Sequence, residues 1–380
     1  MILLKGFLAS SSNDAQETFA CRANASMERM RGMGYFRDNI ERMQGYVPGL
    51  QPTGRGFIKL NTNENPYPPS PKVLEAVKGA ASDALRRYPD PMANEFRDAV
   101  AEGYGVAREE VLGGNAADDL LSIIARSFLG PGDRAVYPYP TYFLYETLCA
   151  IQDAEALEID FPEDYSLPRG LFEAEGKVMF LCNPNSPSGT AVPPREVKRL
   201  AEGFDGIVVV DEAYADFAEE DCLGLFREHD NVIIVRTLSK SFSLAGMRCG
   251  FAVANEDIVS GLAKVKDSFN MDRVSIAAGA AAIADIEYAR GNVEKIKRTR
   301  SRLSEGLAEL GFSVYPSQTN FVLARISDPS AEEVYGHLSE KRIFVRYFDK
   351  RNLTDCLRIT VGTDGEIDRL LEELSLMLKG

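Results

Sequence analysis

The chain has 380 residues, of which 45% are hydrophobic and 26% are charged, so it is long enough for a large folded domain with a smaller companion. The net charge of −14 argues against a surface for nucleic acid or anionic membranes, and no apolar stretch reaches the ~18 residues of a membrane span. The six cysteines lie far apart and the two histidines fit no metal-ligand or catalytic-triad pattern, so we expect no metal and a reducing, cytoplasmic location.

The N-terminal part divides into an arm and a proline-rich entry to the fold. Residues 1–45 are interpreted as an arm outside the fold, because their apolar start is too short for the core of a signal peptide. The segment NTNENPYPPSPKV (61–73) contains too many prolines for a regular helix. The elements expected next are helices at about 71–85, within 92–105 and from Asp118, then a strand, a loop and a helix within 134–151.

A repeated strand–helix pattern follows. Short apolar or β-branched runs end in polar residues, and helical stretches such as PPREVKRLAEGF separate them. Strands that alternate with helices pair in parallel through right-handed crossovers, and functional side chains then gather at the carboxyl ends of the strands. The predicted strands lie in EALEID (155–160), KVMFLCNPN (177–185), GIVVVDEAY (206–214) and NVIIVRTLSK (231–240).

The character of the chain changes at about residue 280. A long charged helix is predicted from Glu287, followed by strands that alternate with helices, a pattern typical of a compact α+β domain. We therefore predict an α/β protein with a large domain over 46–280, built on a mostly parallel sheet flanked by helices, and a smaller α+β domain over 281–380. The strands predicted in the smaller domain are FSVYP, NFVLARI, IFVRYF (343–348) and LRITVG (357–362).

Polar groups at the ends of the predicted strands would meet at one edge of the sheet. Lys240 follows VIIV, and a lysine there is a candidate nucleophile toward carbonyls, although a single loop lysine is more often solvated. Asp211 ends IVVVD and is either a helix cap or a buried partner for a cation, while Tyr214 either joins the site or packs. GGNAADD opens a helix whose backbone N–H groups suit a phosphate. Together these groups suit a flat, phosphorylated, pyridine-containing aldehyde.

Eight motifs, taken in order, resemble those of a known family. They are LNTNENPYPPSP, RYPD, GGNAADD, YPTY, NPNSPSG, VVVDEAYADF, TLSKSFSLAGMRCGF and LRITVG, within a resemblance that covers the chain from about Tyr46 to the C-terminus. On these motifs the chain is similar to the class I/II aminotransferases of the pyridoxal-phosphate fold type I superfamily. The resemblance implies pyridoxal 5′-phosphate as cofactor, the fold type I architecture and a homodimer.

The resemblance also implies a role for each matching residue. Lys240 would bind the cofactor covalently and act as general base, Asp211 would keep the ring nitrogen protonated, and Tyr214 would donate to the ring oxygen. Tyr142 would stack on the ring. The residues implied to hold the phosphate are Ala116, Ala117, Asp118, Thr237, Ser239 and Arg248, with Tyr88 reaching across from the other subunit, and those implied to bind the substrate are Tyr46, Asn65, Arg346 and Arg358.

Two points stay open within the resemblance. The residue before Pro187 is usually an asparagine that contacts the ring oxygen, and here it is Ser186, so Asn185 or a water would fill that role. Arg346 and Arg358 lie in predicted strands, where each side chain faces either the substrate or the solvent. The family match favours the substrate for Arg358, whereas for Arg346 the two orientations are equally compatible with the sequence.

The motifs are most similar to those of enzymes that transaminate histidinol phosphate with 2-oxoglutarate or glutamate in histidine biosynthesis. We therefore expect a transferase acting on a small phosphorylated amino substrate. Decarboxylation of threonine phosphate and transamination of aromatic amino acids stay open as alternatives. A non-enzymatic, cofactor-sensing regulatory domain is disfavoured, because the arm is too short for a preceding helix-turn-helix region. Neither a nucleic acid nor a membrane is an expected partner.

Overall fold

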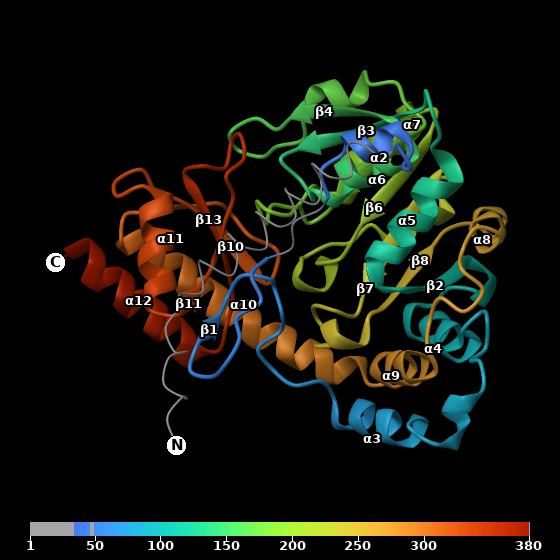
Figure 1. Cartoon of the computed structure of the whole chain (residues 1–380), viewed down its shortest axis with the longest axis horizontal. Coiled ribbons are helices and arrows are strands. Elements are labelled where there is room, and N and C mark those ends of the chain that lie inside the picture. The colour runs from blue at the N-terminus through green and yellow to red at the C-terminus, as the bar shows by residue number, and fades with distance from the viewer. Residues whose placement is uncertain (1–33, 46–48, 380) are drawn as a thin grey trace, which may run out of the picture. The chain divides into compact units, whose positions relative to one another are not determined.

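A computed structural model describes residues 34–45 and 49–379, and contacts within the chain divide it after Gly45 into two units. The described part of the first unit forms the short helix α2 (Asp38–Arg42). The second unit contains all the other described elements, many of which are labelled in Figure 1. Among the described helices, none combines the length and the apolar composition needed to cross a bilayer.

A seven-stranded sheet forms the larger part of the second unit (Figure 1). Its strand order is β2-β8-β7-β6-β5-β3-β4, and β8 runs antiparallel to both of its neighbours while the other neighbouring pairs are parallel. The sheet is therefore mostly parallel, as the sequence predicts. The strands are β2 (Val111–Asn115), β3 (Arg134–Tyr139), β4 (Glu155–Asp160), β5 (Val178–Cys182), β6 (Ile207–Asp211), β7 (Val232–Thr237) and β8 (Cys249–Val253).

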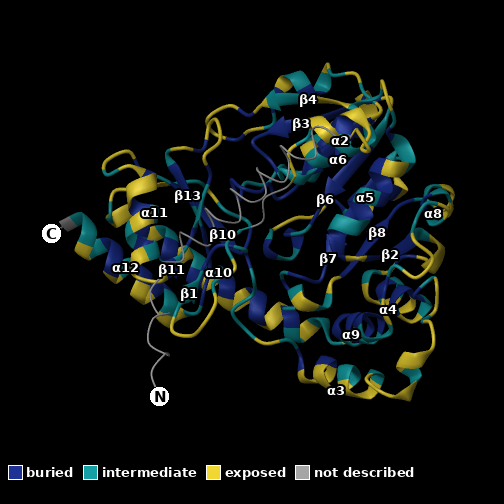
Figure 2. Ribbon diagram, in the orientation of Figure 1, coloured by how far each residue is buried: buried dark blue, intermediate teal, exposed yellow. Residues whose placement is uncertain are grey.

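Both faces of this sheet are buried, because alternate residues of each strand enter different hydrophobic clusters. In β6, Val208 and Val210 belong to one cluster and Val209 to the other. Figure 2 shows β6, β7 and β8 buried over most of their length. Each fully buried valine or isoleucine contributes roughly 1.5–3 kcal/mol, so continuous apolar runs suit these positions. The helices that flank the sheet are α4 (Asn94–Tyr104), α5 (Ala116–Phe128), α6 (Leu144–Gln152), α7 (Pro194–Gly203), α8 (Glu256–Ala263) and α9 (Arg273–Ile283), with α3 (Pro71–Ala80) packed beside α9.

A four-stranded antiparallel sheet lies in the C-terminal part, in the order β12-β13-β10-β9. One hydrophobic cluster contains buried residues of this sheet together with buried leucine or isoleucine residues from each of three helices. The strands are β9 (Ser313–Val314), β10 (Phe321–Arg325), β12 (Arg346–Tyr347) and β13 (Cys356–Thr360), and the helices are α10 (Ile286–Glu309), α11 (Ala331–Glu340) and α12 (Asp364–Lys379).

The segment IFVRYF, predicted as one strand, is divided at Val345 into two short strands. The first, β11 (Ile343–Phe344), pairs in parallel with β1 (Ile58–Lys59), and the second, β12, pairs with β13. Val345 is buried in the core of the C-terminal part. The single-strand prediction is wrong because the periodicity of the segment does not reveal that its two halves have different partners.

The sequence interpretation also missed β1, β8, α8 and α9. β8 follows the turn at Arg248 and contains Gly250, which weakens a strand pattern. Helix α9 is a run of small apolar residues with little helical periodicity, and it begins where the Asp272 side chain accepts hydrogen bonds from the backbone N–H groups of Val274 and Ser275. The five cysteines within the described residues are free and buried.

Candidate functional site

Three adjacent strands of the large sheet bring the predicted reactive groups together. β5, β6 and β7 are neighbours in parallel register, with Cys182 opposite Asp211 and Asp211 opposite Val235. The Asn183 backbone N–H continues this pairing with a 2.9 Å bond to the Asp211 carbonyl. The loops that begin at Asn183 and Glu212, and the loop that carries Lys240, therefore leave the sheet at the same edge.

The Lys240 side chain is partly buried at this edge. Its Nζ donates to the Thr62 carbonyl oxygen at 3.3 Å and lies 5.8 Å from the centre of the Tyr214 ring. Burial, with the positive charge of Arg358 as a second cause, lowers the pKa of the Lys240 amine to about 8. About a tenth of such amines are neutral at pH 7, which makes Lys240 a candidate nucleophile and base.

Asp211 is buried at the end of β6. Tyr145 Oη donates to its Oδ2 at 2.9 Å, and the Ala213 backbone N–H donates to its Oδ1 at 3.2 Å. Burial raises the pKa of the Asp211 carboxyl to about 6. It caps no α-helix, since the next helical element is the 3₁₀ turn η4 (Ala215–Phe217), and within the described residues no cation forms an ion pair with it. A buried carboxylate of this kind is suited to a cationic partner from a ligand.

The start of α5 lies beside the loops that follow β7 and precede β8. The helix begins at Ala116, which has a left-handed φ of +63°, and a Cβ on Gly250 would lie 2.8 Å from the Ala116 carbonyl carbon. Arg248 Nη2 donates to Asp118 Oδ2 at 3.0 Å. A helix N-terminus beside a guanidinium is suited to an anion such as phosphate.

The other residues predicted near this anion lie on the neighbouring strand ends. Thr237 Oγ1 donates to Ser239 Oγ at 2.9 Å, and the Ser239 backbone N–H donates back to Thr237 Oγ1 at 3.2 Å. Tyr142 Oη donates to Asp118 Oδ1 at 2.9 Å, and its ring meets the Tyr145 ring edge-on at 5.8 Å. Register explains the gathering: β8 lies between β2 and β7, so the starts and ends of these strands meet.

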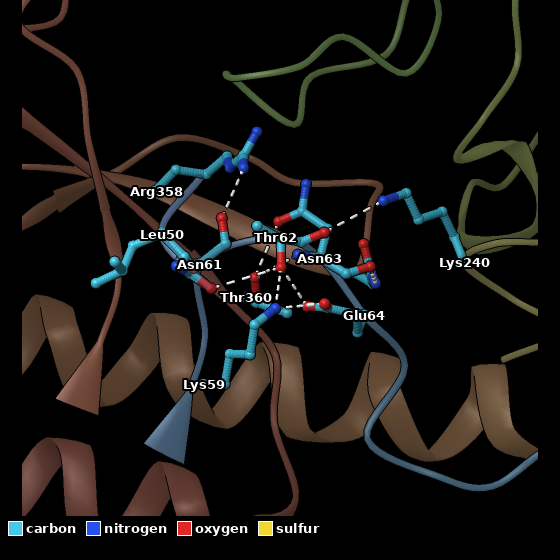
Figure 3. Close-up of polar contacts among 10 residues, drawn as sticks. Leu50, Lys59, Asn61, Thr62, Asn63, Glu64, Lys240, Arg358 and Thr360 are labelled. Carbon is cyan, nitrogen blue, oxygen red and sulfur yellow. Dashed lines mark hydrogen bonds and ion pairs between the residues drawn. The ribbon is translucent and has the colours of Figure 1, made fainter. Parts of the chain in front are cut away.

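A segment that precedes the large sheet joins Lys240 to the small sheet (Figure 3). The carbonyl oxygen of Thr62 accepts from Lys240, and that of the adjacent Asn61 accepts from Arg358 Nη2 at 3.0 Å. Asn65 Nδ2 donates to the backbone carbonyls of Lys240 (3.0 Å) and Ser241 (3.1 Å). Asn65, predicted to contact substrate, thus fixes the backbone at Lys240 and Ser241 through its side-chain amide.

Arg346 and Arg358 are directly opposite each other on the antiparallel pair β12–β13. Residues in this relation project from the same face of a sheet, and the guanidinium carbons lie 5.2 and 5.4 Å from the centre of the Phe348 ring. Arg358 Nη1 also donates to Ser186 Oγ at 3.1 Å. Guanidinium groups suit an anionic ligand such as a phosphate or a carboxylate.

The loop after β5 uses Asn185 and Ser186 differently. The Asn185 side chain accepts from Thr141 Oγ1 (2.8 Å) and donates to the Pro140 carbonyl (3.2 Å) and Ser188 Oγ (2.9 Å). Both polar atoms of Asn185 are thus engaged within the protein. Ser186 Oγ accepts from Arg358, which leaves its single hydrogen for another acceptor.

Two predicted residues are not brought to the lysine within the chain as described. Tyr46 lies outside the described residues. Tyr88 is 77% exposed and stacks on Phe269 with the ring centres 4.5 Å apart. Within the described residues, Tyr88 of the motif RYPD therefore lies on the surface of the single chain.

The sequence interpretation missed Tyr145, Asn63 and Thr360. Tyr145 lies one helical turn after Tyr142, so the motif YPTYFLY contained a signal for it. Asn63 donates to Tyr214 Oη at 2.9 Å and bonds to Thr360, but nothing in NTNEN distinguishes this buried asparagine from its neighbours. Burial raises the pKa of Tyr214 to about 12, so its phenol stays protonated at neutral pH.

The donor set fits the ligand that the sequence suggests. A phosphorylated pyridine aldehyde requires an amine for its carbonyl, a carboxylate for its ring nitrogen, a donor for its ring oxygen and an anion site for its phosphate. Lys240, Asp211 and Tyr214 offer the first three, and the start of α5 with Arg248 offers the fourth. The buried carboxylate is the most telling observation, because no cation among the described residues forms an ion pair with it.

Comparison with known proteins agrees with this arrangement. The family described as "Aminotransferase class I and II" matches residues 55–374. The chain is 49% identical over 347 residues to histidinol-phosphate aminotransferase 1 from a Nostoc species, covering 91% of this chain and 98% of that protein. It is 45% identical over 336 residues to histidinol-phosphate aminotransferase from Rhodopirellula baltica, covering 88% of this chain and 93% of that protein.

Among solved structures, the chain resembles histidinol-phosphate aminotransferase from Sinorhizobium meliloti in complex with pyridoxal-5′-phosphate. The TM-score is 0.83 at 27% identity, with 91% of this chain and 98% of that chain covered. A mutant of aspartate aminotransferase from Thermus thermophilus, at 21% identity and a TM-score of 0.76, shares the fold over 91% of this chain and 100% of that chain. The predicted fold class is confirmed.

Proposed function

The chain belongs to the class I and II aminotransferases, and we propose that it transfers an amino group between histidinol phosphate and 2-oxoglutarate with pyridoxal 5′-phosphate as its cofactor. The relatives named above support this substrate over threonine phosphate and aromatic amino acids, since several at 40–49% identity are histidinol-phosphate aminotransferases. The reaction interconverts an amine and a ketone on a phosphorylated substrate, with glutamate as the other amino compound.

The observation that carries the proposal is the closeness of a reactive amine to an anion-binding guanidinium. Lys240 and Arg358 donate to the carbonyls of adjacent residues, Thr62 and Asn61. The first group suits chemistry at a carbonyl and the second suits recognition of a phosphate. A substrate that carries both an amine and a phosphate needs these two groups together.

The cofactor would be held by groups from four strand ends. Lys240 would bind it covalently, Asp211 would pair with the ring nitrogen, and Tyr214 and Ser186 would donate to the ring oxygen. Asn185 is less suited to the ring oxygen, because its side chain is engaged within its own loop. When bound, pyridoxal phosphate supplies an electron sink for the charge that develops on the substrate carbon. The ring and phosphate contacts would come from Tyr142 and from Ala116, Ala117, Asp118, Thr237, Ser239 and Arg248.

Lys240 and Asp211 would take part most directly in the reaction. The Lys240 amine would move the proton at the substrate carbon that carries nitrogen, a role that its lowered pKa favours. Burial raises the pKa of the Asp211 carboxyl, and a protonated ring nitrogen beside it would lower that pKa again, because an opposite charge favours the ionised form. Asp211 would then be charged when the cofactor is bound. Asn65 would support the reaction by fixing the backbone at Lys240.

Substrate recognition would lie with the two arginines on the small sheet. Arg358 and Arg346 would bind the phosphate of histidinol phosphate, and a carboxylate of glutamate in the other half-reaction. A guanidinium pairs bidentately with either anion, so one pair of arginines serves both substrates. We assign Tyr46 to the same substrate site on the resemblance of its motif alone.

We further propose a cytoplasmic homodimer in which Tyr88 completes the phosphate site of the partner subunit. The exposure of Tyr88 in the single chain supports this proposal, since an exposed aromatic side chain is available to a second copy. The domains proposed are 46–280 for the cofactor and 281–380 for substrate recognition, with residues 1–45 as an arm.

The direct test is a transamination assay. The purified protein with pyridoxal phosphate should form glutamate from histidinol phosphate and 2-oxoglutarate, and it should release no carbon dioxide from threonine phosphate. Phenylalanine and tyrosine as amino donors serve as the specificity control. Absence of glutamate with histidinol phosphate, or faster turnover of an aromatic amino acid, would contradict the proposed substrate.

A further inference from the structure

Asn63 is a buried residue with a partner for each of its polar groups. It is 1% exposed and has a left-handed φ of +58°. Its backbone N–H donates to Thr360 Oγ1 at 3.0 Å, and its carbonyl accepts from Asn320 Nδ2 at 2.9 Å. Its side-chain Oδ1 accepts from Thr360 Oγ1 at 2.9 Å, and its Nδ2 donates to Tyr214 Oη at 2.9 Å. The amide therefore stands between a small-sheet threonine and the site tyrosine.

These bonds fix the direction of the amide. Thr360 Oγ1 accepts from the Asn63 N–H, so its single hydrogen is the one that reaches Asn63 Oδ1. The opposite end of the amide, which faces Tyr214, must then be the NH₂ group. An NH₂ group only donates, so the Tyr214 oxygen accepts, and the phenol hydrogen is left for a different acceptor.

We propose that Asn63 is a positioning residue that forces Tyr214 to donate its hydrogen into the cofactor site, an inference that rests on the proposed function. The acceptor would be the ring oxygen of pyridoxal phosphate, whose anionic form a donated hydrogen bond favours. Thr360 takes part as the group that prevents the Asn63 amide from turning over. The order of donation is thus Thr360 to Asn63, Asn63 to Tyr214, and Tyr214 to the site.

The same strand supplies both the orienting group and the anion-binding group. Thr360 follows Arg358 by two residues on β13, so the two side chains project from the same face of the small sheet. Both reach the segment at residues 61–63, Arg358 through the Asn61 carbonyl and Thr360 through Asn63 (Figure 3). The direction of the hydrogen bond at Tyr214 therefore depends on Thr360, which lies in the part of the molecule that we propose binds substrate.

The first test reverses the polarity with Asn63→Asp, which is nearly isosteric but accepts where the amide donates. The absorbance of bound pyridoxal phosphate is titrated against pH, and its dissociation constant is measured by equilibrium dialysis. Loss of the donated bond should move the spectral midpoint upward by about one pH unit and weaken binding about 10-fold or more. A midpoint and an affinity equal to those of the unchanged protein would overturn the inference.

A double-mutant cycle separates positioning from the added charge. In a Tyr214→Phe background, Asn63→Asp should produce a much smaller shift, because the group through which it acts is gone. An equal shift in both backgrounds would mean that the carboxylate acts directly, and would overturn the inference. Failure of the unchanged protein to bind pyridoxal phosphate would instead overturn the proposed function, and this inference with it.

Thr360 supplies a second pair of variants should Asn63→Asp not fold. Thr360→Ser keeps the hydroxyl and should retain the spectral midpoint. Thr360→Val removes it, frees the amide to turn over, and should raise the midpoint in the same direction as Asn63→Asp. Equal midpoints for the serine and valine variants would overturn the role of Thr360 in orienting the amide and, with it, the inference.

Discussion

The large and small sheets carry their functional groups in different ways. Both faces of the large sheet are buried, so its reactive groups, Asp211 and Lys240, lie where strands end or just beyond. The small sheet buries one face against helices, and Arg358 lies mid-strand between Leu357 and Ile359, which point into that core. In a doubly covered parallel sheet, strand ends are the positions available for chemistry, whereas the small sheet presents Arg358 from the middle of a strand, on the face opposite Leu357 and Ile359.

This contrast assigns different kinetic effects to the two sheets. Groups at the ends of the large-sheet strands should affect cofactor binding and kcat. Arg346 on the small sheet should affect KM for phosphorylated substrates and leave the bound cofactor undisturbed, whereas Arg358 also bonds to Ser186, which we propose contacts the ring oxygen. A variant that crossed this division would weaken the contrast.

The largest effect is expected from Lys240→Ala. Loss of the positioned base and covalent anchor should lower kcat by roughly 10²–10⁴-fold or more, measured with histidinol phosphate and 2-oxoglutarate. Lys264→Ala, which removes an exposed lysine, is the matched control and should stay active. Borohydride reduction followed by mass spectrometry should place the pyridoxyl adduct on Lys240, and an adduct on Lys264 or Lys266 would contradict the assignment.

Asp211→Asn should lower activity and at the same time flatten the pH dependence of stability of the cofactor-free protein. Loss of a charge-assisted bond to the ring nitrogen, worth roughly 1.5–3 kcal/mol, corresponds to about a 10- to 150-fold fall in kcat. The folded pKa of about 6 lies above the ordinary 3.8, so the folded state binds more protons between these values and stability falls as pH rises through that window.

Thermal unfolding of the cofactor-free protein from pH 4 to pH 7 would measure the second effect. Between pH 4 and pH 7 the stability of Asp211→Asn should decrease less than that of the unchanged protein, since the variant has no carboxyl to ionise at this position. Asp205→Asn, at an exposed position, should leave the fall unchanged. If Asp211→Asn and Asp205→Asn behaved alike, the buried carboxylate would not be the source of the effect.

Arg358→Ala should raise KM for histidinol phosphate by about 10- to 150-fold, with a smaller increase for Arg346→Ala. Arg358 is expected to matter more because it also bonds to Ser186 and to the Asn61 carbonyl. Arg325→Ala, on the same sheet but paired with Glu163, is the control. A changed absorption spectrum of the bound cofactor in Arg346→Ala would show that the division between the sheets is incomplete.

The smallest signal is expected from mixing Lys240→Ala, which should be inactive, with Tyr88→Ala, which should bind the cofactor poorly. If Tyr88 serves the partner subunit, random pairing makes about half of the dimers mixed, and each mixed dimer has one site with both groups intact. Roughly a quarter of all sites should then recover when the variants are refolded together at limiting cofactor. Activity no greater than the average of the two parents would place Tyr88 within its own chain.

The fold class and the groups at the large-sheet strand ends could be predicted from the sequence because their patterns are local. A run such as IVVVD shows both a buried strand and the polar residue that ends it. IFVRYF was interpreted wrongly because its two halves pair with β1 and β13, which lie elsewhere in the chain. β8 was missed because a turn and a glycine hide its pattern.

The amino-acid order alone therefore determined that a carboxylate ends one buried strand and that a lysine closely follows another, since burial of an apolar run depends on its own residues. Only the tertiary structure decided that Arg346 and Arg358 share a face, because that depends on register between strands. The tertiary structure also decided the orientation of the Asn63 side-chain amide, whose partners Tyr214 and Thr360 lie 151 and 297 residues away. Hydrogen-bond direction in a buried network depends on every member at once, and no local pattern contains that information.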